Sequence, residues 1–373
     1  MLPCSAKLIN KPNFDGIFQA WKTSRPNDLE PDFTSVIKMD VPVNEFSFFQ
    51  FELTAPIAVR ELICSMRNHV VWARSSRVDD LNEWPLWEGL SREEIGDCAV
   101  LHEKMQAEMQ SKHQDDFRRH LPLGYMATFS FGMSFRELVK FINALFREKE
   151  KIKTLVFDDV AYALLLAVAN KSRKIGHTFS DEGFHEILLN AALSYEWYNP
   201  HQLFPAFQPS DDALIGSFAS ISLQTTLQLR SQLIRHRALQ FRDNFAVFFE
   251  PGGLACPMSS AIEMQVVLPM DFAVSLTRSR SCWIADTKLW KQMIEKLQAL
   301  LGNGDVLLPC YDGKCRFQRD NGLRREAKDP APPCPKAAIL EGIPLTFKQS
   351  CDALAYSQQR PNFDFWKKDI ENG

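Results

Sequence analysis

No run of apolar residues in the sequence is long enough to cross a bilayer, and no charge of one sign dominates. The longest apolar run, from Val160 to Ala169, falls well short of the roughly 20 residues that a membrane-spanning helix needs. Lys and Arg number 43 against 46 Asp and Glu, so the formal net charge of −3 provides no field for capturing duplex DNA or RNA. The first residues also lack the basic and apolar regions of a secretory signal. We therefore expect a cytoplasmic protein that binds neither nucleic acid nor membrane.

Glycine, proline and cysteine are too sparse or too irregularly spaced for several other classes of protein. With 16 Gly and 21 Pro in 373 residues, collagen-like and low-complexity chains are excluded. Nine cysteines without a scaffold spacing favour free thiols in a reducing compartment. Four of them could form a zinc site, but their irregular spacing favours buried or loop thiols, so we predict no metal: Cys310, Cys315, Cys334 and Cys351. No glycine-rich phosphate loop is present, so a nucleotide would have to be held by side chains.

An extended apolar stretch that runs into a helix occurs twice. The first copy spans Phe48 to Pro56 and leads into a helix predicted from Ile57 to His69. The second copy spans Phe218 to Thr226 and leads into a helix predicted from Leu227 to Arg237. Since 373 residues exceed what one hydrophobic core usually supports, a doubled domain is the expectation.

A second landmark recurs in the same order. Leu121-Pro122 precedes an alternating strand and then an amphipathic helix around Phe135 to Leu145. Leu268-Pro269 precedes a strand predicted up to Thr277 and a helix predicted from Asp286 to Leu301. We predict an α+β chain with a first repeat over residues 1–172 and a second over 173–373, the latter with an irregular tail containing Cys and Pro. Each repeat is expected to be a mixed sheet flanked by helices.

The sharpest polar cluster is the run from Gln232 to Arg237. On a helix, Gln232, Arg235 and His236 share one face, because they are spaced at i, i+3 and i+4. Guanidinium and imidazole groups are costly to bury without an anionic or planar partner, which favours a binding site. A solvated basic helix end that offsets the helix dipole is the alternative.

The cluster resembles the signature of the flavin-dependent thymidylate synthases, the ThyX family. That signature has an Arg-His-Arg triplet with a Gln three residues before it, then seven residues, then Ser, Gly and Arg. The second half keeps Gln232 and the triplet Arg235-His236-Arg237, but Phe245 replaces the Ser. The first half keeps only the last triplet residue, Arg67, and keeps the downstream part as Ser75 and Arg77.

The second landmark is divided in the same way. The family carries an Arg three residues before Leu-Pro and another at the start of the following helix. The first half matches with Arg118 and Arg136, whereas the second has Gln265 and Trp283 at the positions aligned with them. Each half thus retains what the other has lost. The resemblance implies an intrachain pseudo-dimer of two ThyX-like domains that share a ligand cleft, and a homodimer that would form a pseudo-tetramer.

The resemblance also implies a chemistry and a role for each residue. NADPH would reduce FAD, and the reduced flavin would supply the hydride. Methylenetetrahydrofolate would supply the one-carbon unit, and dUMP is the expected acceptor. The expected catalytic residues are Arg136 and Arg235, which would orient or polarise the pyrimidine. Nucleotide binding is expected from Ser75, Arg77, Arg118, Arg136, Gln232 and Arg235. Cofactor binding is expected from Arg235, His236 and Arg237.

Departures from the family pattern keep two alternatives open. The family His before the strand is replaced by Phe46 and Gly216, and the carboxylates before the signature Ser by Ala73-Arg74. A hydroxymethylase-type variant acting on dUMP or dCMP is one alternative. A catalytically inactive protein that binds pyrimidine nucleotides is the other.

Overall fold

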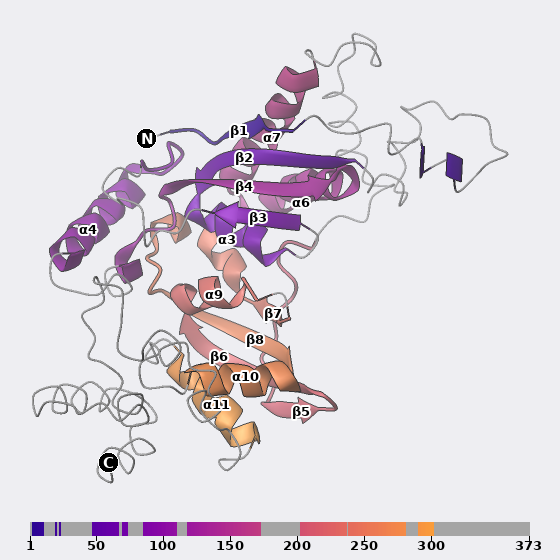
Figure 1. Ribbon diagram of the computed structural model, residues 1–373. Helices are drawn as coiled ribbons and strands as arrows, with labels where there is room; N and C mark the ends of the chain where they lie inside the picture. The colour runs from indigo at the N-terminus through magenta and orange to yellow at the C-terminus, as the bar shows by residue number, and fades with distance from the viewer. Residues whose placement is uncertain are drawn as a thin grey trace, which may run out of the picture. The chain divides into compact units, whose positions relative to one another are not determined.

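The chain forms two compact units, which are described separately. The computed structural model describes residues 2–10, 19–20, 22–23, 47–66, 69–73, 85–109, 118–172, 202–236, 238–280 and 290–301 (Figure 1). The first unit comprises Met1–Pro205 and Phe245–Ser260, and the second comprises Ala206–Asn244 and Ala261–Gly373. A short segment from the later part of the chain therefore belongs to the first unit. The boundary predicted between residues 172 and 173 stays a prediction.

The first unit is built on a four-stranded antiparallel sheet in the order β1-β2-β4-β3 (Figure 1). Its strands are β1 (Ser5–Leu8), β2 (Phe48–Pro56), β3 (His69–Ala73) and β4 (Met126–Ser134). Its α-helices are α3 (Ile57–Ser65), α4 (Arg92–Met109), α6 (Phe135–Ile152) and α7 (Val156–Ser172). Its 3-10 helices are η3 (Arg118–His120), η4 (Phe245–Phe249) and η5 (Gly253–Ala255).

Alternation along β2 explains which face of this sheet is buried. Phe49, Phe51 and Leu53 have no exposed surface, whereas Gln50 and Glu52 between them face solvent. The predicted apolar stripe of α6 is confirmed, because its members are all fully buried: Leu138, Phe141, Ile142 and Leu145. One helical face therefore packs against one sheet face, which makes an α+β core.

The second unit has a sheet with the same strand order, β5-β6-β8-β7, and every pairing is again antiparallel. The mixed sheet expected in each repeat is therefore wrong for the described strands, which are connected so that neighbours run in opposite directions. Its strands are β5 (Ala213–Ile215), β6 (Phe218–Thr226), β7 (Gln240–Asp243) and β8 (Ala261–Pro269). Its helices are α9 (Leu227–Leu233), α10 (Met270–Arg280) and α11 (Lys291–Leu301).

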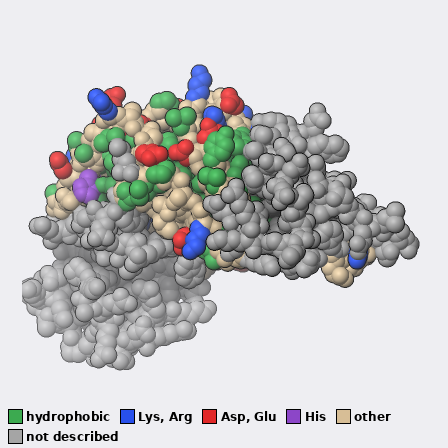
Figure 2. Space-filling view, turned by 90° about the horizontal axis from the view of Figure 1, so that it is seen from above, with side chains coloured by type: hydrophobic (Ala, Val, Ile, Leu, Met, Phe, Trp, Pro, Cys, Tyr) green, Lys and Arg blue, Asp and Glu red, His purple; other side chains and the backbone are tan. Residues whose placement is uncertain are grey.

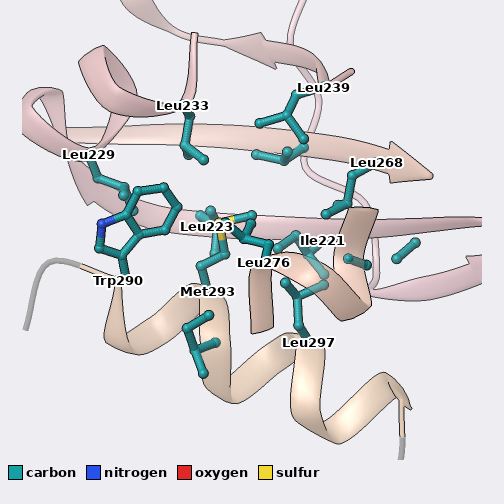
Figure 3. Packing of buried hydrophobic residues seen from close by; sticks show 14 of the residues in the cluster. Ile221, Leu223, Leu229, Leu233, Leu239, Leu268, Leu276, Trp290, Met293 and Leu297 are labelled. Carbon is teal, nitrogen blue, oxygen red and sulfur yellow. The ribbon is translucent and has the colours of Figure 1, made fainter. Parts of the chain in front are cut away.

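The core of the second unit lies between this sheet and its helices. Figure 3 shows Trp290, Met293 and Leu297, at and within α11, facing Ile221 and Leu223 of β6. All five side chains are at most 2% exposed. The buried positions of α11 repeat with helical spacing, which agrees with the amphipathic helix expected to end at Leu301.

The strand-to-helix transitions predicted for the first landmark are confirmed. Strands β2 and β6 span the expected residues, and helices follow directly at Ile57 and Leu227. Both helices are shorter than expected, since α3 ends at Ser65 and α9 ends at Leu233. The triplet in the second half therefore begins beyond the end of its helix.

The strand predicted from Leu268 to Thr277 is wrong. Strand β8 ends at Pro269 and residues 270–280 form α10. The alternation of apolar side chains after Pro269 is accidental, because the positions actually buried, Ala273, Leu276 and Thr277, have helical spacing. In the sheets β8 and α10 take the places of β4 and α6, so Leu268-Pro269 corresponds to the end of β4 and not to the residues before it. Gln265 and Trp283, which were expected to align with Arg118 and Arg136, are consequently not their counterparts.

The helices and the surface of the described residues agree with the low net charge and short apolar runs of the sequence. No helix within the described part of the chain is both long and apolar enough to span a bilayer. On the face seen in Figure 2, side chains of both charges lie among apolar ones. The described surface on this face therefore shows the mixture of charges that the net charge of −3 implies.

Truncating Leu223 tests the core of the second unit. Leu223→Ala should lower the free energy of unfolding by about 2–5 kcal/mol, because it leaves a cavity in a packed core. Leu214→Ala is the control, since Leu214 is 48% exposed. Chemical denaturation of both variants gives the measurement, and equal small losses would contradict this packing.

Candidate functional site

The first unit carries two of the expected site arginines, Arg118 and Arg136. Arg118 begins η3 and is 9% exposed. Arg136 lies half-buried in the first turn of α6. Ser134 caps that helix by accepting a hydrogen bond from the Glu137 amide at 3.3 Å. The helix dipole disfavours a cation at a helix N-terminus. An anion or a carbonyl oxygen bound there would therefore offset the charge of Arg136.

These two arginines lie towards opposite ends of the sheet in the first unit. The amide of Ala58, at the start of α3, donates to the carbonyl of Leu123, in the segment between η3 and β4. At the other end of β4, Ser134 pairs with Phe48 at the start of β2. A nine-residue strand measures about 27 Å from end to end. The expectation that Arg118 and Arg136 bind the same nucleotide stays a prediction, and the first unit alone does not bring the two residues together.

The positions that correspond to Arg118 and Arg136 in the second half also differ from the expected ones. With the first residues of α6 and α10 aligned, Gly253 corresponds to Arg118 and Asp271 to Arg136. A Cβ atom on Gly253 would lie 2.6 Å from the carbonyl carbon of Phe248, so no side chain fits there without a backbone shift. The expected counterpart Gln265 instead lies within β8 and donates to the hydroxyl of Ser220 at 3.0 Å.

The second unit carries Gln232, Arg235 and His236. Helix α9 is capped by Thr226, whose hydroxyl accepts from the Leu229 amide at 3.4 Å. The helix ends at Leu233, and Arg235 follows in an exposed turn. The helical face that the spacing predicted for the three residues is therefore interrupted.

Each neighbour of Arg235 has a defined contact. The Gln232 side-chain oxygen accepts a hydrogen bond from the Trp290 indole at 3.1 Å. The His236 ring meets the Phe272 ring edge-on, with centroids 5.6 Å apart. The His236 amide donates to the Leu233 carbonyl at 2.9 Å. Gln232 and His236 are thus fixed from within the second unit, and the Arg235 side chain is exposed to an approaching ligand.

Several expected site residues lie outside the described residues. They are Ser75, Arg77 and Arg237, together with Phe46, Arg67, Arg74 and Trp283 and the four cysteines Cys310, Cys315, Cys334 and Cys351. Among the residues that the structure describes, no group of three His, Cys, Asp or Glu side chains is arranged to hold a metal ion.

A second polar cluster, which the sequence did not indicate, lies in the first unit. The Tyr125 hydroxyl and His102 Nδ1 are 2.5 Å apart. Burial, with a smaller contribution from Cys98, raises the pKa of Tyr125 to about 12. Burial and the charges of Glu94 and Asp97 raise the pKa of Cys98 to about 12. The phenol and the thiol are therefore protonated at neutral pH, and neither provides a nucleophile.

No family model and no curated protein sequence matches the chain. Among solved structures, it is similar to thymidylate synthase X (ThyX) from Helicobacter pylori with FAD and dUMP, at 15% identity over 46% of this chain and 96% of that chain, with a TM-score of 0.38. It is also similar to the UMP/dUMP methylase PolB from Streptomyces cacaoi bound with 5-Br UMP, at 16% identity over 52% and 96%, with a TM-score of 0.36.

Alkylation tests the state of the buried thiol. Cys98 should be protected from iodoacetamide at pH 8, because a pKa of about 12 leaves roughly one thiol in ten thousand ionised. Its pKa is raised, so the labelling rate should climb tenfold per pH unit while the fold persists. Peptide mass spectrometry of the folded protein gives the rate, and urea-unfolded protein is the control. Fast labelling of folded protein at pH 8 would contradict the burial of Cys98.

Proposed function

We propose that the chain transfers a one-carbon unit from methylenetetrahydrofolate to C5 of a pyrimidine deoxynucleotide monophosphate, with dUMP as the preferred acceptor. FAD would supply the reducing equivalents and NADPH would reduce it. The observation that carries the proposal is the division of the Arg-His-Arg signature between two halves whose sheets have the same strand order. Both parts of the signature follow a strand-to-helix transition that begins at the expected residue.

We further propose that the two halves are copies of one domain. In each half a strand runs directly into a helix twice, as β2 into α3 and β4 into α6, and as β6 into α9 and β8 into α10. The halves differ in the connection between the first helix and the fourth strand. That connection spans residues 66–125 in the first half, where it contains α4, and only residues 234–260 in the second. An insertion in this connection accounts for the difference in length.

A local two-fold relation inside the first unit supports this origin. The Leu123 amide donates to the Cys256 carbonyl at 3.0 Å, and the Met258 amide donates to the Leu121 carbonyl at 2.9 Å. With α6 and α10 aligned at their first residues, Leu123 corresponds to Met258 and Leu121 to Cys256, so exchanging counterparts converts one bond into the other. Such reciprocity is the property of an isologous contact between identical subunits. It is expected if a self-associating domain was duplicated within one chain.

The side chains of the second unit fit the proposed ligands. Arg235 has an exposed planar guanidinium, and the half-buried ring of His236 belongs to the next residue of the chain. A guanidinium stacks on planar rings and forms paired hydrogen bonds to phosphate or carbonyl oxygens. Arg235 and His236 would lie against the flavin or folate ring. A donor from Arg136 to the pyrimidine carbonyl would stabilise negative charge developing on that oxygen.

Arg118 and Arg136 require a second protomer if both contact one nucleotide. Their places towards opposite ends of β4 separate them within a chain. In a homodimer, Arg118 of one protomer and Arg136 of the other would meet at a shared cleft, as is common where subunit interfaces form sites. This arrangement is part of the proposal, as is the homodimer itself.

A nucleotide-binding protein without catalysis is the second candidate. Gly216, at the position of the family His, has a φ of +58° in the turn between β5 and β6. A side chain there would strain the backbone, so this half cannot regain a His at no cost. A rise in melting temperature with dUMP, without flavin reduction by NADPH, would select this candidate. Product mass spectrometry with dUMP and dCMP separates methyl from hydroxymethyl transfer.

Substitution of Arg235 tests the proposed activity. The purified protein should be yellow and release nearly stoichiometric FAD on denaturation. Arg235→Ala should reduce turnover of dUMP at least a hundredfold, because an essential donor to the reacting ligands is lost. Arg242→Ala is the control, since Arg242, like Arg235, is an exposed arginine of the second unit, and it lies on β7 with no place in the proposed site. Equal activity of the two variants, or colourless protein that FAD cannot reconstitute, would overturn the proposal.

Mixing two inactive variants tests whether a site is shared between protomers. Arg118→Ala and Arg136→Ala should each be nearly inactive. After the two are mixed and allowed to exchange subunits, activity should return to about a quarter of wild type, because half of the dimers then contain one intact site in two. Turnover before and after exchange is the measurement. No recovery, despite exchange seen by native mass spectrometry, would contradict the shared site.

A further inference from the structure

Two buried arginines occupy corresponding positions in the two units but have different partners. Arg60 of α3 and Arg230 of α9 are each the fourth residue of their helix, and each is at most 3% exposed. The Arg230 Nε lies 2.7 Å from Oδ2 of Asp243, a residue of β7. The Arg60 Nη2 lies 2.7 Å from Oε1 of Glu61, the next residue in its own helix. One ion pair joins a helix to a strand, and the other stays within a helix.

The strand residue explains the difference. Asp243 is the last residue of β7, and its counterpart in the first unit is Ala73, the last residue of β3. The first unit therefore has alanine at the place of the aspartate that pairs with Arg230. The half that lost the Arg-His-Arg triplet also has this alanine, and the half that kept the triplet has the aspartate.

The Arg230–Asp243 pair closes the loop that carries the triplet. It joins the last turn of α9 to the end of β7, and the turn containing Arg235 and His236 lies between them in the chain. The Arg230 guanidinium also lies over the ring of Phe241, 5.8 Å from its centroid. The backbone of the turn is held in addition by a hydrogen bond from the Leu239 amide to the His236 carbonyl at 3.0 Å.

Burying two charges is not the cheapest way to join a helix to a strand. Desolvation offsets most of the attraction between buried ions, and apolar side chains of similar volume often stabilise a fold as well or better. The pair instead fixes the orientation of α9 relative to the end of β7, because a guanidinium and a carboxylate bond only in a narrow geometry. Both side chains are at most 7% exposed, so solvent screens them little.

We propose that Arg230 and Asp243 are positioning residues that fix the turn bearing Arg235 and His236. Through this turn they set the affinity for the pyrimidine nucleotide, a consequence that rests on the proposed function. The Arg60–Glu61 pair joins two neighbouring residues of α3 and does not connect the helix to the end of β3, so it is the comparison for this role. The chain thus offers its own matched control.

The test compares two double variants, Arg230→Met with Asp243→Leu, and Arg60→Met with Glu61→Leu. Each removes both charges of a buried pair, which avoids leaving a single buried ion. Hydrogen exchange of the Ile234, His236 and Leu239 amides is followed by mass spectrometry without nucleotide. Affinity for dUMP is then measured by calorimetry on the full-length protein. Arg230→Gln with Asp243→Asn, which removes both charges and keeps polar side chains, replaces the first double variant if that one does not fold.

The first double variant should exchange these amides roughly tenfold faster and bind dUMP roughly tenfold or more weakly. The second should change neither the exchange rate nor the affinity by more than about twofold. Both double variants should keep a comparable melting temperature, so a difference between them would not reflect loss of global stability. Unchanged exchange in the Arg230 variants, or equal effects from both doubles, would overturn the inference. Faster exchange in a protein whose wild type binds no dUMP would support the positioning role and overturn the proposed function instead.

Discussion

The nine-residue pairing between the two central strands of each sheet is the constraint on which the rest of the structure depends. In the first unit, Phe48 to Pro56 pair with Ser134 to Met126, and in the second Phe218 to Thr226 pair with Pro269 to Ala261. Each ladder fixes where the following helix starts, since α3 and α9 begin one residue after the last pair. The alternation that buries one face of β2 leaves no freedom to slip by one residue. The ends of these strands are therefore where side chains can be held with precision.

The candidate site residues lie at those ends. Arg136 follows β4, Arg118 precedes it, and Arg235 follows the helix that β6 leads into. Local contacts then distinguish the residues: Gln232 is bonded to Trp290, whereas Arg235 is exposed. A rigid sheet with ligand-facing residues on its connections is a common basis for binding sites. The two sheets have the same strand order, but different cationic side chains lie on their connections: Arg118 and Arg136 in the first unit and Arg235 in the second.

The sequence predicted the parts that depend on local pattern. Strands β2 and β6 and the buried face of α6 followed from apolar spacing, because burial on one face imposes that spacing directly. The strand predicted after Pro269 is a helix, because a short apolar run can satisfy both the strand and the helix period, and only the packing of Ala273 and Leu276 decides between them. The helix end at Leu233 and the Arg230–Asp243 pair could not be predicted, because both depend on contacts with distant residues.

The segment from Phe245 to Ser260 has a consequence for assembly. It belongs to the first unit, where Phe249 packs against Phe157 with ring centroids 4.8 Å apart. Between separate subunits, such a contact would weaken on dilution. Within one chain its effective concentration is set by the length of the connecting backbone and does not depend on how much protein the cell makes. Because the two segments belong to one chain, this contact forms in a first-order process whose rate does not depend on protein concentration.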